Sequence, residues 1–416
     1  MKITFIQSKA DRFWESLGIG YIASYIKKNY RENLDINFFH GNFDNEKDII
    51  RESSKSDIVA FSCTTPTFEN SYRLASMIKD KNPKVCTIFG GWHTTTDITD
   101  YDDVIDFSVI GEGENTLLGL LVGKVNTYEK IIGNYKSIVY GDLIDINKLE
   151  WPNRELIKQD RMLDLCESMC GERIGSFQSR RGCPINCIFC GESCMTRNSQ
   201  VRVRDTEDLL NEIEYVYNKY NLTMFKFVDP TWCYPKSAAK NFCEAKIKRS
   251  FELPWEGMGH ASFLNKEMLQ LMKEAGCKQI NIGVESGSQK LLNNMKKGVT
   301  ISKIKKVFKW CKEVGIESRA FFILGMPEET IETVEQTRQF VHEIKPNVFG
   351  MTILTPFPGT NFYDSIKHKN IDWSNCDEYS NNFWETKNFT NAQLRYIQSR
   401  FNNEFKDILV SHQRNK

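Results

Sequence analysis

Apolar runs alternate with amphipathic stretches along about the first 120 residues of the chain. Five runs are rich in β-branched and aromatic residues, as buried parallel strands are, and they cover residues 3–7, 35–40, 57–63, 84–91 and 106–111. Helical patterns lie between them, for example over residues 21–30 and 70–80. The alternation predicts a Rossmann-like, doubly wound α/β domain of five units, with a ligand site outside the carboxyl ends of its strands.

The same alternation resumes after a segment that has mixed turn signals and no clear period. Predicted strands cover residues 173–179, 224–229, 255–261, 279–285, 318–325 and 348–354, and predicted helices cover 206–220, 237–248, 266–275, 301–314 and 329–344. Six βα units in sequence predict an open, partial (β/α)6 barrel of the TIM type. We therefore expect α/β domains at 1–125 and 172–363, a connector at 126–171 and a C-terminal helical extension at 364–416.

Composition and charge narrow the class of protein. The 416 residues are 40% hydrophobic and 26% charged, which is ordinary for a globular chain of two or three domains. The net charge is only +1, so the overall electrostatic field of the protein does not favour binding to nucleic acid or to a membrane surface. The opening sequence MKITFIQSKADRF does not resemble a signal peptide, and no apolar run approaches the roughly 20 residues of a transmembrane helix. We expect a cytoplasmic protein that binds neither nucleic acid nor membranes.

A cluster of cysteines follows the first predicted barrel strand, in the sequence RRGCPINCIFCGESC. Cys183, Cys187 and Cys190 form a C-x3-C-x2-C pattern on a loop at the carboxyl end of the barrel, where active sites lie. The 13 cysteines are spread along the chain, unlike the disulfide framework of a small secreted domain. A structural zinc ion needs four ligands, and the only nearby pair, Cys166 and Cys170, precedes the strand. Three thiolates on a [4Fe–4S] cluster would instead leave one iron open to a substrate.

The residues around these cysteines resemble the radical S-adenosylmethionine (SAM) superfamily. The resemblance lies in SRRGCPINCIFC, in NIGVESGSQKLLNNMKKG at residues 281–298 and in GIESRAFFILGMPEETIETVEQT at residues 315–337, and it covers about residues 173–363. It implies that the open iron of the cluster binds the amino and carboxylate groups of SAM. It also implies that an electron, from a donor such as flavodoxin or ferredoxin, cleaves SAM to methionine and a 5′-deoxyadenosyl radical, which abstracts hydrogen from the substrate.

The resemblance assigns roles to residues on several strand ends. Glu285 and Ser286 would contact the ribose and carboxylate of SAM, and Arg319 would pair with its carboxylate. Asp229 stands where the family usually has a Gly-Gly-Glu segment that receives the SAM amino group. The adenine would be bordered by the ring of Phe189 and by the backbone of Leu324 and Gly325.

Three further positions remain open. The related cobalamin subgroup has an arginine before alanine at the third strand, where this chain has His260, and we assign that residue no role. Cys194 extends the pattern to C-x3-C-x2-C-x3-C, and a fourth thiolate would turn the site into a plain electron carrier. The surrounding barrel argues against such a carrier, so we interpret Cys194 and Cys233 as buried small hydrophobic residues, with a role near the substrate as the alternative.

The first domain resembles the cobalamin-binding domain of the cobalamin-dependent radical SAM subgroup. The matching sequences are ESLGIGYIASYIK, SCTTPT, GGWHTTT and IGEGENTL. We place Ser62, Thr64, Gly90 and Gly91 against the corrin or its nucleotide tail, because small residues let the backbone approach a flat ligand. The loop after the first strand, QSKADRFWESLG, lacks the histidine that ligates the lower face of cobalamin in other enzymes, and His40 and His93 read as packed or solvated histidines.

The leading hypothesis from the sequence is a cobalamin-dependent radical SAM methyltransferase. Its substrate would be a small molecule or peptide that is methylated on an unactivated carbon or on phosphinate phosphorus. The alternatives are a radical SAM enzyme that catalyses a cyclisation, dehydrogenation or rearrangement, with or without cobalamin, and a non-catalytic iron–sulfur electron carrier. We predict that the substrate lies near the loops at residues 231–235 and 355–360. The side chains of these loops do not indicate a chemical class of substrate.

Overall fold

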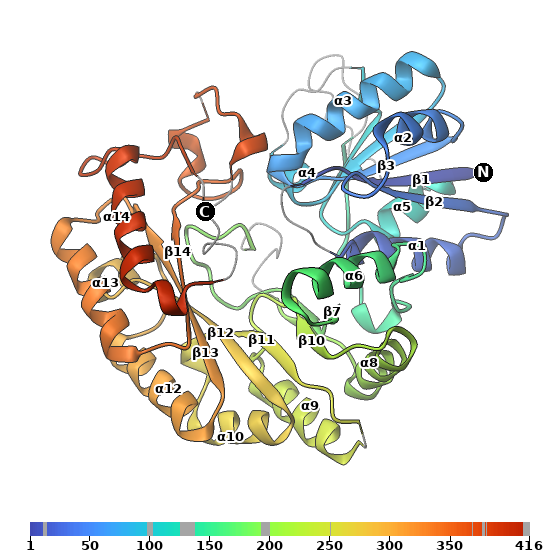
Figure 1. Ribbon diagram of the computed structural model, residues 1–416. Helices are drawn as coiled ribbons and strands as arrows, with labels where there is room; N and C mark the ends of the chain where they lie inside the picture. Colours follow the sequence, from blue (N-terminus) through green and yellow to red (C-terminus); the bar gives the residue numbers. More distant parts are fainter. Residues whose placement is uncertain are drawn as a thin grey trace. The chain divides into compact units, whose positions relative to one another are not determined.

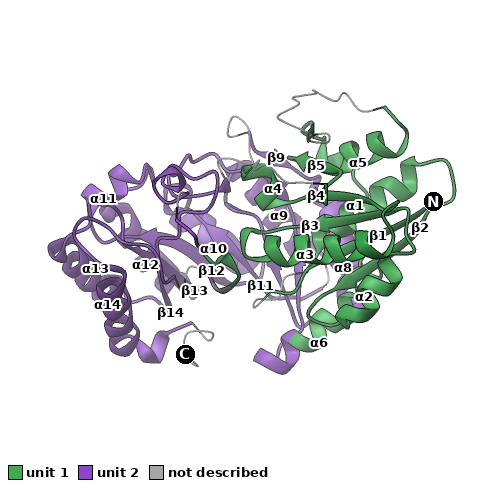
Figure 2. Cartoon of the chain, turned by 90° about the horizontal axis from the view of Figure 1, so that it is seen from above, with its two compact units in different colours: residues 1–165, 372–375 green, residues 166–371, 376–416 purple. Residues whose placement is uncertain are grey.

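The computed structural model describes residues 1–10, 15–97, 103–124, 138–192, 200–249, 251–367, 369–376, 379 and 381–410. The chain divides into two compact units, which are coloured separately in Figure 2. The first unit comprises Met1–Leu165 and Asp372–Asn375, and the second comprises Cys166–Ile371 and Cys376–Lys416. No helix among the described residues is both long enough and apolar enough to cross a membrane.

The first unit contains a six-stranded sheet in which every pairing is parallel. The strand order is β2-β1-β3-β4-β5-β6, so the order reverses between β1 and β3, and this reversal is a topological switch point. The strands are β1 (Lys2–Gln7), β2 (Asp35–His40), β3 (Ile58–Ser62), β4 (Cys86–Gly90), β5 (Phe107–Ile110) and β6 (Ile138–Tyr140). The helices are α1 (Leu17–Asn29), α2 (Glu46–Ser53), α3 (Thr65–Lys81), α4 (Trp92–Thr96) and α5 (Glu114–Leu121), with the 3₁₀ helices η1 (Ile146–Lys148) and η5 (Trp373–Asn375).

Alternate residues of the first sheet belong to separate hydrophobic cores, as period-two side chains require. Phe5 packs in a cluster with residues of α1 and α5, whereas its neighbour Ile6 packs in a cluster with residues of α2 and α3. Helices therefore cover both faces of the sheet (Figure 1). The predicted doubly wound α/β fold is confirmed.

The sheet has one strand more than the five that the sequence predicts. Strand β6 lies inside the segment assigned to a connector and pairs in parallel with β5, with Val109 opposite Val139. Because β6 is only three residues long, it shows no periodic pattern that would mark it as a strand. The helix α6 (Gln159–Cys170) also lies within that segment.

The second unit contains six parallel strands, each paired with the next one in sequence. They are β7 (Ile174–Phe177), β10 (Met224–Phe227), β11 (Trp255–Gly259), β12 (Cys277–Glu285), β13 (Glu317–Leu324) and β14 (Val348–Ile353), and β7 and β14 are the two edges of this sheet. The helices α8 (Thr206–Tyr220), α9 (Lys236–Lys248), α10 (Lys266–Glu274), α12 (Ile301–Val314) and α13 (Ile331–Ile344) lie along the outer face of the curved sheet (Figure 1). The predicted partial (β/α)6 barrel is confirmed.

Shorter elements complete the second unit. A two-stranded antiparallel ribbon, β8 (Arg180–Arg181) with β9 (Arg202–Val203), follows β7. The 3₁₀ helix η3 (Ala261–Phe263) follows β11, and the short helix α11 (Gln289–Asn294) follows β12. The C-terminal extension contains η4 (Tyr363–Ser365), α14 (Asn391–Glu404) and η6 (Lys406–Ile408), and it returns to the barrel edge, where Val410 N donates to Phe349 O at 2.9 Å.

Candidate functional site

The three predicted cluster cysteines lie on the loop that follows the β8 strand, here called the cysteine loop (residues 182–190). Gly182 has φ +102°, a left-handed conformation that turns the chain into Cys183 at no steric cost. Cys183 Sγ lies 3.2 Å from Thr231 Oγ1, on the loop after β10. Cys190 N donates to Cys187 O at 3.1 Å, which holds the last two cysteines in one turn. The sequence spacing therefore folds into a compact loop at the carboxyl end of the barrel.

Two further loops hold the middle of the cysteine loop. Ile188 N donates to Met295 O at 3.2 Å, and Asn361 N donates to Ile188 O at 3.2 Å. Met295 follows α11 and Asn361 follows β14, so segments far apart in sequence meet at Ile188. This arrangement brings loops from the first, fourth and sixth barrel strands together at the cysteines.

The thiols of Cys187 and Cys190 lie in a low-dielectric setting that disfavours their thiolate forms. Burial raises the pKa of Cys187 to about 12 and that of Cys190 to about 11, and the Lys297 ammonium opposes both shifts. A buried thiolate therefore needs a metal or a cation to stabilise it. Lys297 supplies one such cation from the chain itself.

The cysteine loop supplies the number of thiols that an open [4Fe–4S] cluster needs. A structural zinc ion needs four ligands around one centre, whereas Cys183, Cys187 and Cys190 supply three. The thiolates on a [4Fe–4S] cluster instead bind separate iron atoms, so three thiols on one open loop suit it.

The end of strand β12 has a strained backbone that presents an acidic residue. The β12–β13 register shifts between Gly283 and Glu285, and Glu285 has φ +64°, which is rare for a residue with a side chain. Glu285 Oε1 accepts from Lys297 Nζ at 2.6 Å, and both residues are buried. A Cβ on Gly283 would lie 2.3 Å from Glu285 Oε1, so only glycine leaves room for the carboxylate. Strain of this kind is typical of functional sites.

Lys297 is a site residue that the sequence analysis does not single out. Its Nζ lies 5.9 Å from the centre of the Phe189 ring, and Phe189 is the predicted adenine neighbour. Burial lowers the pKa of Lys297, but the charges of Glu285 and Cys187 outweigh that effect, so the pKa is raised and the ammonium persists. The motif NNMKKG contains Lys297 but gives no pattern that separates it from its neighbour Lys296.

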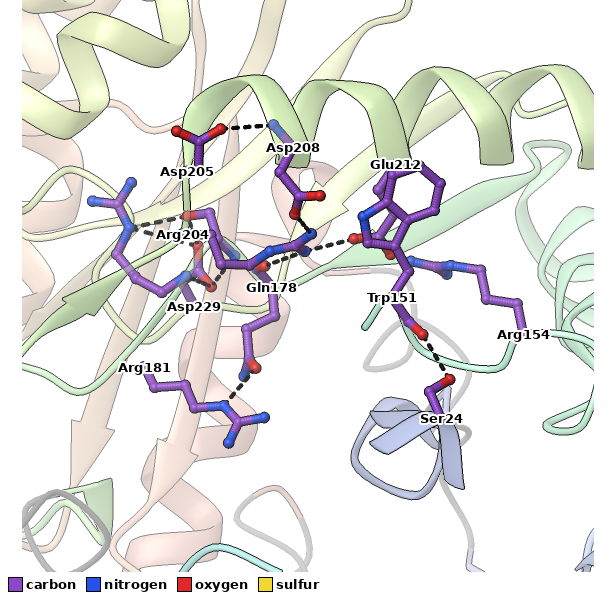
Figure 3. Close-up of polar contacts among 12 residues, drawn as sticks. Ser24, Trp151, Arg154, Gln178, Arg181, Arg204, Asp205, Asp208, Glu212 and Asp229 are labelled. Atoms are coloured by element: carbon purple, nitrogen blue, oxygen red, sulfur yellow. Dashed lines mark hydrogen bonds and ion pairs between the residues drawn. The ribbon is translucent and has the colours of Figure 1, made fainter. Parts of the chain in front are cut away.

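Asp229 is fully buried beside the strand that leads into the cysteine loop (Figure 3). Its Oδ1 accepts from Ser179 N at 2.9 Å and from Arg180 N at 3.1 Å, and its Oδ2 accepts from Ser179 Oγ. Arg180 Nε lies 3.8 Å from the same carboxylate. Burial raises the pKa of Asp229, and these hydrogen bonds oppose the shift. These contacts hold the backbone before the cysteines, and the assignment of Asp229 to the SAM amino group stays a prediction.

A second ion-pair group lies beside Asp229. Arg204 donates to Glu212 and to Asp208 on helix α8, while Arg181 Nε donates to Gln178 Oε1 at 2.9 Å (Figure 3). Arg204 N also donates to Ser179 O at 2.9 Å. These contacts fasten the β8–β9 ribbon to α8 and so support the entry to the cysteine loop.

The predicted adenine border lies at the end of β13. Gly325 has φ +86°, its N–H donates to Glu329 Oε2, and its carbonyl accepts from Trp384 Nε1 at 2.6 Å. Leu324 is fully buried. The backbone at this strand end is therefore fixed from both sides, whereas its contact with adenine stays a prediction.

Two other predicted SAM residues differ in their surroundings. Ser286 is fully buried, and its Oγ lies 3.3 Å from Thr337 Oγ1 and accepts from Ser288 N at 3.1 Å. Arg319 pairs in register with Asn281 and lies five residues before the carboxyl end of β13. The Arg319 Nε is buried without a hydrogen-bond partner among the described residues. The predicted contacts of both residues with SAM remain untested.

In the first unit, the predicted cobalamin residues gather at the carboxyl edge of the sheet. Ser62 pairs in register with Gly90, and Thr64 begins helix α3 through a capping box with Thr67. Gly91 has φ +95°, and a Cβ there would lie 2.8 Å from both N and O of Cys63, so this glycine is required by the chain itself. A Cβ on Gly90 would meet nothing closer than 3.7 Å. Gly90 therefore leaves room for a ligand without being needed for the fold.

His93, His40 and Cys233 have packing contacts. His93 Nδ1 lies 3.2 Å from Thr65 Oγ1 and its ring lies 4.3 Å from the Phe68 ring. His40 lies 4.9 Å from the ring of Phe43. Cys233 is fully buried, where it accepts from His260 N at 3.3 Å. Cys194 lies outside the described residues.

Comparison with known families decides the class of the protein. A model of the radical SAM superfamily matches residues 178–341, and a model of the B12 binding domain matches residues 3–121. The chain belongs to the radical SAM superfamily and carries a B12-binding domain. These two domains imply a [4Fe–4S] cluster and SAM in the second unit and cobalamin in the first.

Several curated proteins are similar over most of this radical SAM chain. An uncharacterized methyltransferase of Pyrococcus horikoshii is 27% identical over 91% of this chain and 84% of its own length. The anaerobic magnesium-protoporphyrin IX monomethyl ester cyclase of Rubrivivax gelatinosus is 25% identical over 86% of this chain and 67% of its own length. Bacteriochlorophyllide d C-12(1)-methyltransferase of Chlorobaculum tepidum is 24% identical over 80% of this chain and 71% of its own length.

Solved structures share the fold. The radical SAM methyltransferase TsrM from Kitasatospora setae, with cobalamin and a [4Fe–4S] cluster bound, has a TM-score of 0.70 at 17% identity, over 86% of this chain and 73% of its own. The cobalamin-dependent SAM radical enzyme OxsB has a TM-score of 0.68 at 16% identity, over 99% of this chain and 62% of its own. The two-domain order of the chain is therefore an established architecture.

Proposed function

We propose that this radical SAM protein is a cobalamin-dependent methyltransferase that acts on an unactivated carbon, or on phosphinate phosphorus, of a small molecule or peptide. The observation that carries the proposal is the occurrence in one chain of the three-cysteine loop and a B12-binding domain. The similarity to proteins named as methyltransferases supports it. We also propose that an electron donor such as flavodoxin or ferredoxin reduces the cluster.

Each unit contributes residues to this function. Cys183, Cys187 and Cys190 would hold the cluster, with the Lys297 ammonium offsetting part of its negative charge. When bound, the cluster and SAM supply the radical that activates the substrate, and cobalamin supplies the methyl group. Glu285 would orient SAM from the strained end of β12.

The four residues at the carboxyl edge of the first sheet would accept cobalamin. Gly90 leaves open space there, and Ser62 and Thr64 present hydroxyl groups from the end of β3 and the start of α3. The switch point between β1 and β3 lies at the same edge, where ligands bind in doubly wound sheets.

The first experiment is to purify the full chain without oxygen after growth with hydroxocobalamin and to measure iron, sulfide and extracted corrin. About one equivalent of cobalamin, together with 5′-deoxyadenosine and S-adenosylhomocysteine as products from SAM, would support a methyltransferase, because radical formation and methyl transfer each consume SAM. An intact cluster without cobalamin would overturn the proposal. Cys187→Ala should lose the cluster, whereas Cys243→Ala, a buried cysteine on α9, should keep it.

A second candidate is radical chemistry without methyl transfer, such as a cyclisation. The similarity to the anaerobic cyclase of Rubrivivax gelatinosus favours it. The products separate the two candidates, since a cyclase would release 5′-deoxyadenosine without S-adenosylhomocysteine. A third candidate, the electron carrier, requires Cys194 as a cluster ligand, and it is contradicted if Cys194→Ala retains the full iron content.

A further inference from the structure

His260 occupies a fixed place beside the cysteine loop, although the sequence gives it no role. It is 5% exposed and begins the 3₁₀ helix η3, where its Nδ1 accepts from Ser262 N at 3.3 Å. Its other ring nitrogen, Nε2, lies 2.9 Å from the carbonyl oxygen of Lys297. Because Nδ1 is an acceptor, Nε2 carries the proton and donates to Lys297 O. Burial lowers the pKa of His260 to about 4, so the ring stays neutral and keeps this tautomer.

The residue that His260 holds belongs to a tight turn after α11, here called the lysine turn (residues 295–298). Lys296 has φ +54° and Gly298 has φ +66°, so both residues that flank Lys297 are left-handed. Lys297 N donates to Leu292 O at 3.0 Å, which closes the end of α11. Ser262 Oγ donates to Gly298 O at 2.7 Å, a second contact from η3 to the same turn.

The opposite side of the lysine turn faces the cysteine loop. Met295 O accepts from Ile188 N, which lies between Cys187 and Phe189. The Lys297 side chain reaches Glu285, and its charge acts on both Cys187 and Cys190. The side chains of His260 and Ser262 therefore fix, through its main-chain carbonyls, a turn whose own Lys297 side chain sets the charge beside the predicted cluster ligands.

We propose that His260 is a positioning residue for the iron–sulfur site, because its hydrogen bond to the Lys297 carbonyl places the Lys297 ammonium beside the cysteine loop. The inference rests on the proposed function only in that the three cysteines hold a cluster. A nearby cation favours the reduced cluster, which carries one more negative charge than the oxidised cluster. Displacing the ammonium, while Glu285 keeps its charge, therefore makes the cluster harder to reduce.

Two substitutions separate the contacts of His260. His260→Asn keeps an acceptor where Nδ1 lies, and asparagine is a good residue for starting a helix, but it loses the donor to Lys297 O. His260→Gln keeps an amide donor near the Nε2 position but loses the contact with Ser262 N. Lys297→Met removes the ammonium itself. The comparison of these three variants isolates the Lys297 contact from a general effect on folding.

The experiment measures the reduced fraction of the cluster by electron paramagnetic resonance, in anaerobically reconstituted full-length protein poised at fixed potentials without substrate. We expect His260→Asn and Lys297→Met each to lower the ratio of reduced to oxidised cluster about tenfold, which is about 59 mV for one electron. His260→Gln should stay near the wild type. The double variant His260→Asn/Lys297→Met should show no further shift, because both changes act through one ammonium.

The outcomes that would overturn the positioning role of His260 differ from those that would overturn the proposed methyl transfer. An unchanged ratio in His260→Asn, or an equal shift in His260→Gln, would overturn the positioning role and leave the proposed methyl transfer untouched. Additive shifts in the double variant would also overturn it. If His260→Asn fails to retain a cluster, His260→Ser takes its place, since serine is also a good residue for starting a helix and also lacks the donor to Lys297 O. A shift in His260→Ser then supports the inference, and no shift overturns it. Absence of cobalamin with these shifts present would overturn the methyltransferase proposal alone.

Discussion

Lys297 Nζ lies 2.6 Å from Glu285 Oε1, and the side chains of the two residues are only 10% and 8% exposed. The pair joins the strained end of β12 to the turn after α11, so it links two segments that flank the cysteine loop. A buried ion pair adds little net stability over an apolar pair of equal size, but it becomes costly when one partner is removed. Its presence at a left-handed glutamate therefore indicates function more than stability.

Removing one partner of this pair tests its burial. Lys297→Met should lower the free energy of unfolding by roughly 3–5 kcal/mol, because it leaves the Glu285 carboxylate buried and unpaired. Glu285→Gln/Lys297→Met should regain most of that loss. The measurement is anaerobic urea unfolding of the cluster-free protein. Lys290→Met is the control, since Lys290 and Glu328 are 69% and 55% exposed at 3.8 Å, and this change should alter stability by less than about 1 kcal/mol. Equal effects of the two lysine changes would contradict the prediction.

Much of the fold follows from periodic patterns that long elements carry. The helices α8 and α12 begin and end where the sequence predicts, because Asp205 and Thr300 accept hydrogen bonds at their starts and Gly315 is left-handed at the end of α12. The strands β6 and β8 and the helix α11 are too short to show a period, and the sequence analysis misses them.

The candidate site also contains residues that the sequence predicts and residues that it does not. The cysteines could be predicted as site residues from the sequence because their spacing on one loop is typical of cluster ligands. Glu285 could be predicted because it lies at the end of a predicted strand. The roles of Lys297 and His260 could not be predicted from the sequence, because they depend on a turn and on a hydrogen bond between segments 37 residues apart. Tertiary contacts of this kind leave no local pattern in a single sequence.

The glycine pair after β4 separates a structural role from a ligand role. Gly91→Ala should lower the free energy of unfolding by at least about 2 kcal/mol, because it combines a left-handed φ with a Cβ 2.8 Å from the Cys63 backbone. Gly90→Ala should change stability by less than about 1 kcal/mol, since its nearest neighbour is 3.7 Å away. If cobalamin approaches this edge, Gly90→Ala should still lower the corrin content of the purified protein. Full corrin content in a folded Gly90→Ala variant would move the predicted corrin contact away from Gly90.

The hydrogen bonds of Asp229 predict a graded response to substitution. Asp229→Ala removes the acceptor for Ser179 N and Arg180 N, and it should lower the free energy of unfolding by about 2–4 kcal/mol and reduce the iron content. Asp229→Asn retains an acceptor oxygen and should lose less than half as much stability. Calorimetric titration of Asp229→Asn with SAM then tests the predicted contact with the amino group. A tenfold weaker affinity with an intact cluster would support that contact, and an unchanged affinity would leave Asp229 with the backbone contacts alone.

Glu329 predicts how the stability of the protein depends on pH. It is fully buried, Gly325 N donates to its Oε2, and its Oε1 has no hydrogen-bond partner among the described residues. Burial raises the pKa of Glu329 from 4.5 to about 7, and the backbone hydrogen bonds from Gly325 and Met326 only partly oppose the shift. The folded state therefore holds this proton more tightly than the unfolded state does.

The sign of the pH dependence follows from linkage. A carboxyl whose pKa is raised on folding stabilises the protein fully below the unfolded pKa of 4.5, and this contribution is lost as the pH rises to about 7. The loss amounts to about 3 kcal/mol, because each pKa unit corresponds to about 1.4 kcal/mol. Glu329→Gln, which stays neutral, should not lose this contribution. The difference in free energy of unfolding between Glu329→Gln and the wild type should therefore grow in favour of the variant from pH 4.5 to 7 and stay constant above pH 7, as measured by urea unfolding across that range. The exposed Glu328→Gln change is the matched control and should show no such trend. A difference for Glu329→Gln that is independent of pH would mean that the Glu329 carboxylate is ionised in the folded protein throughout that pH range. The backbone of Gly325 would then be held by a charged rather than a neutral group.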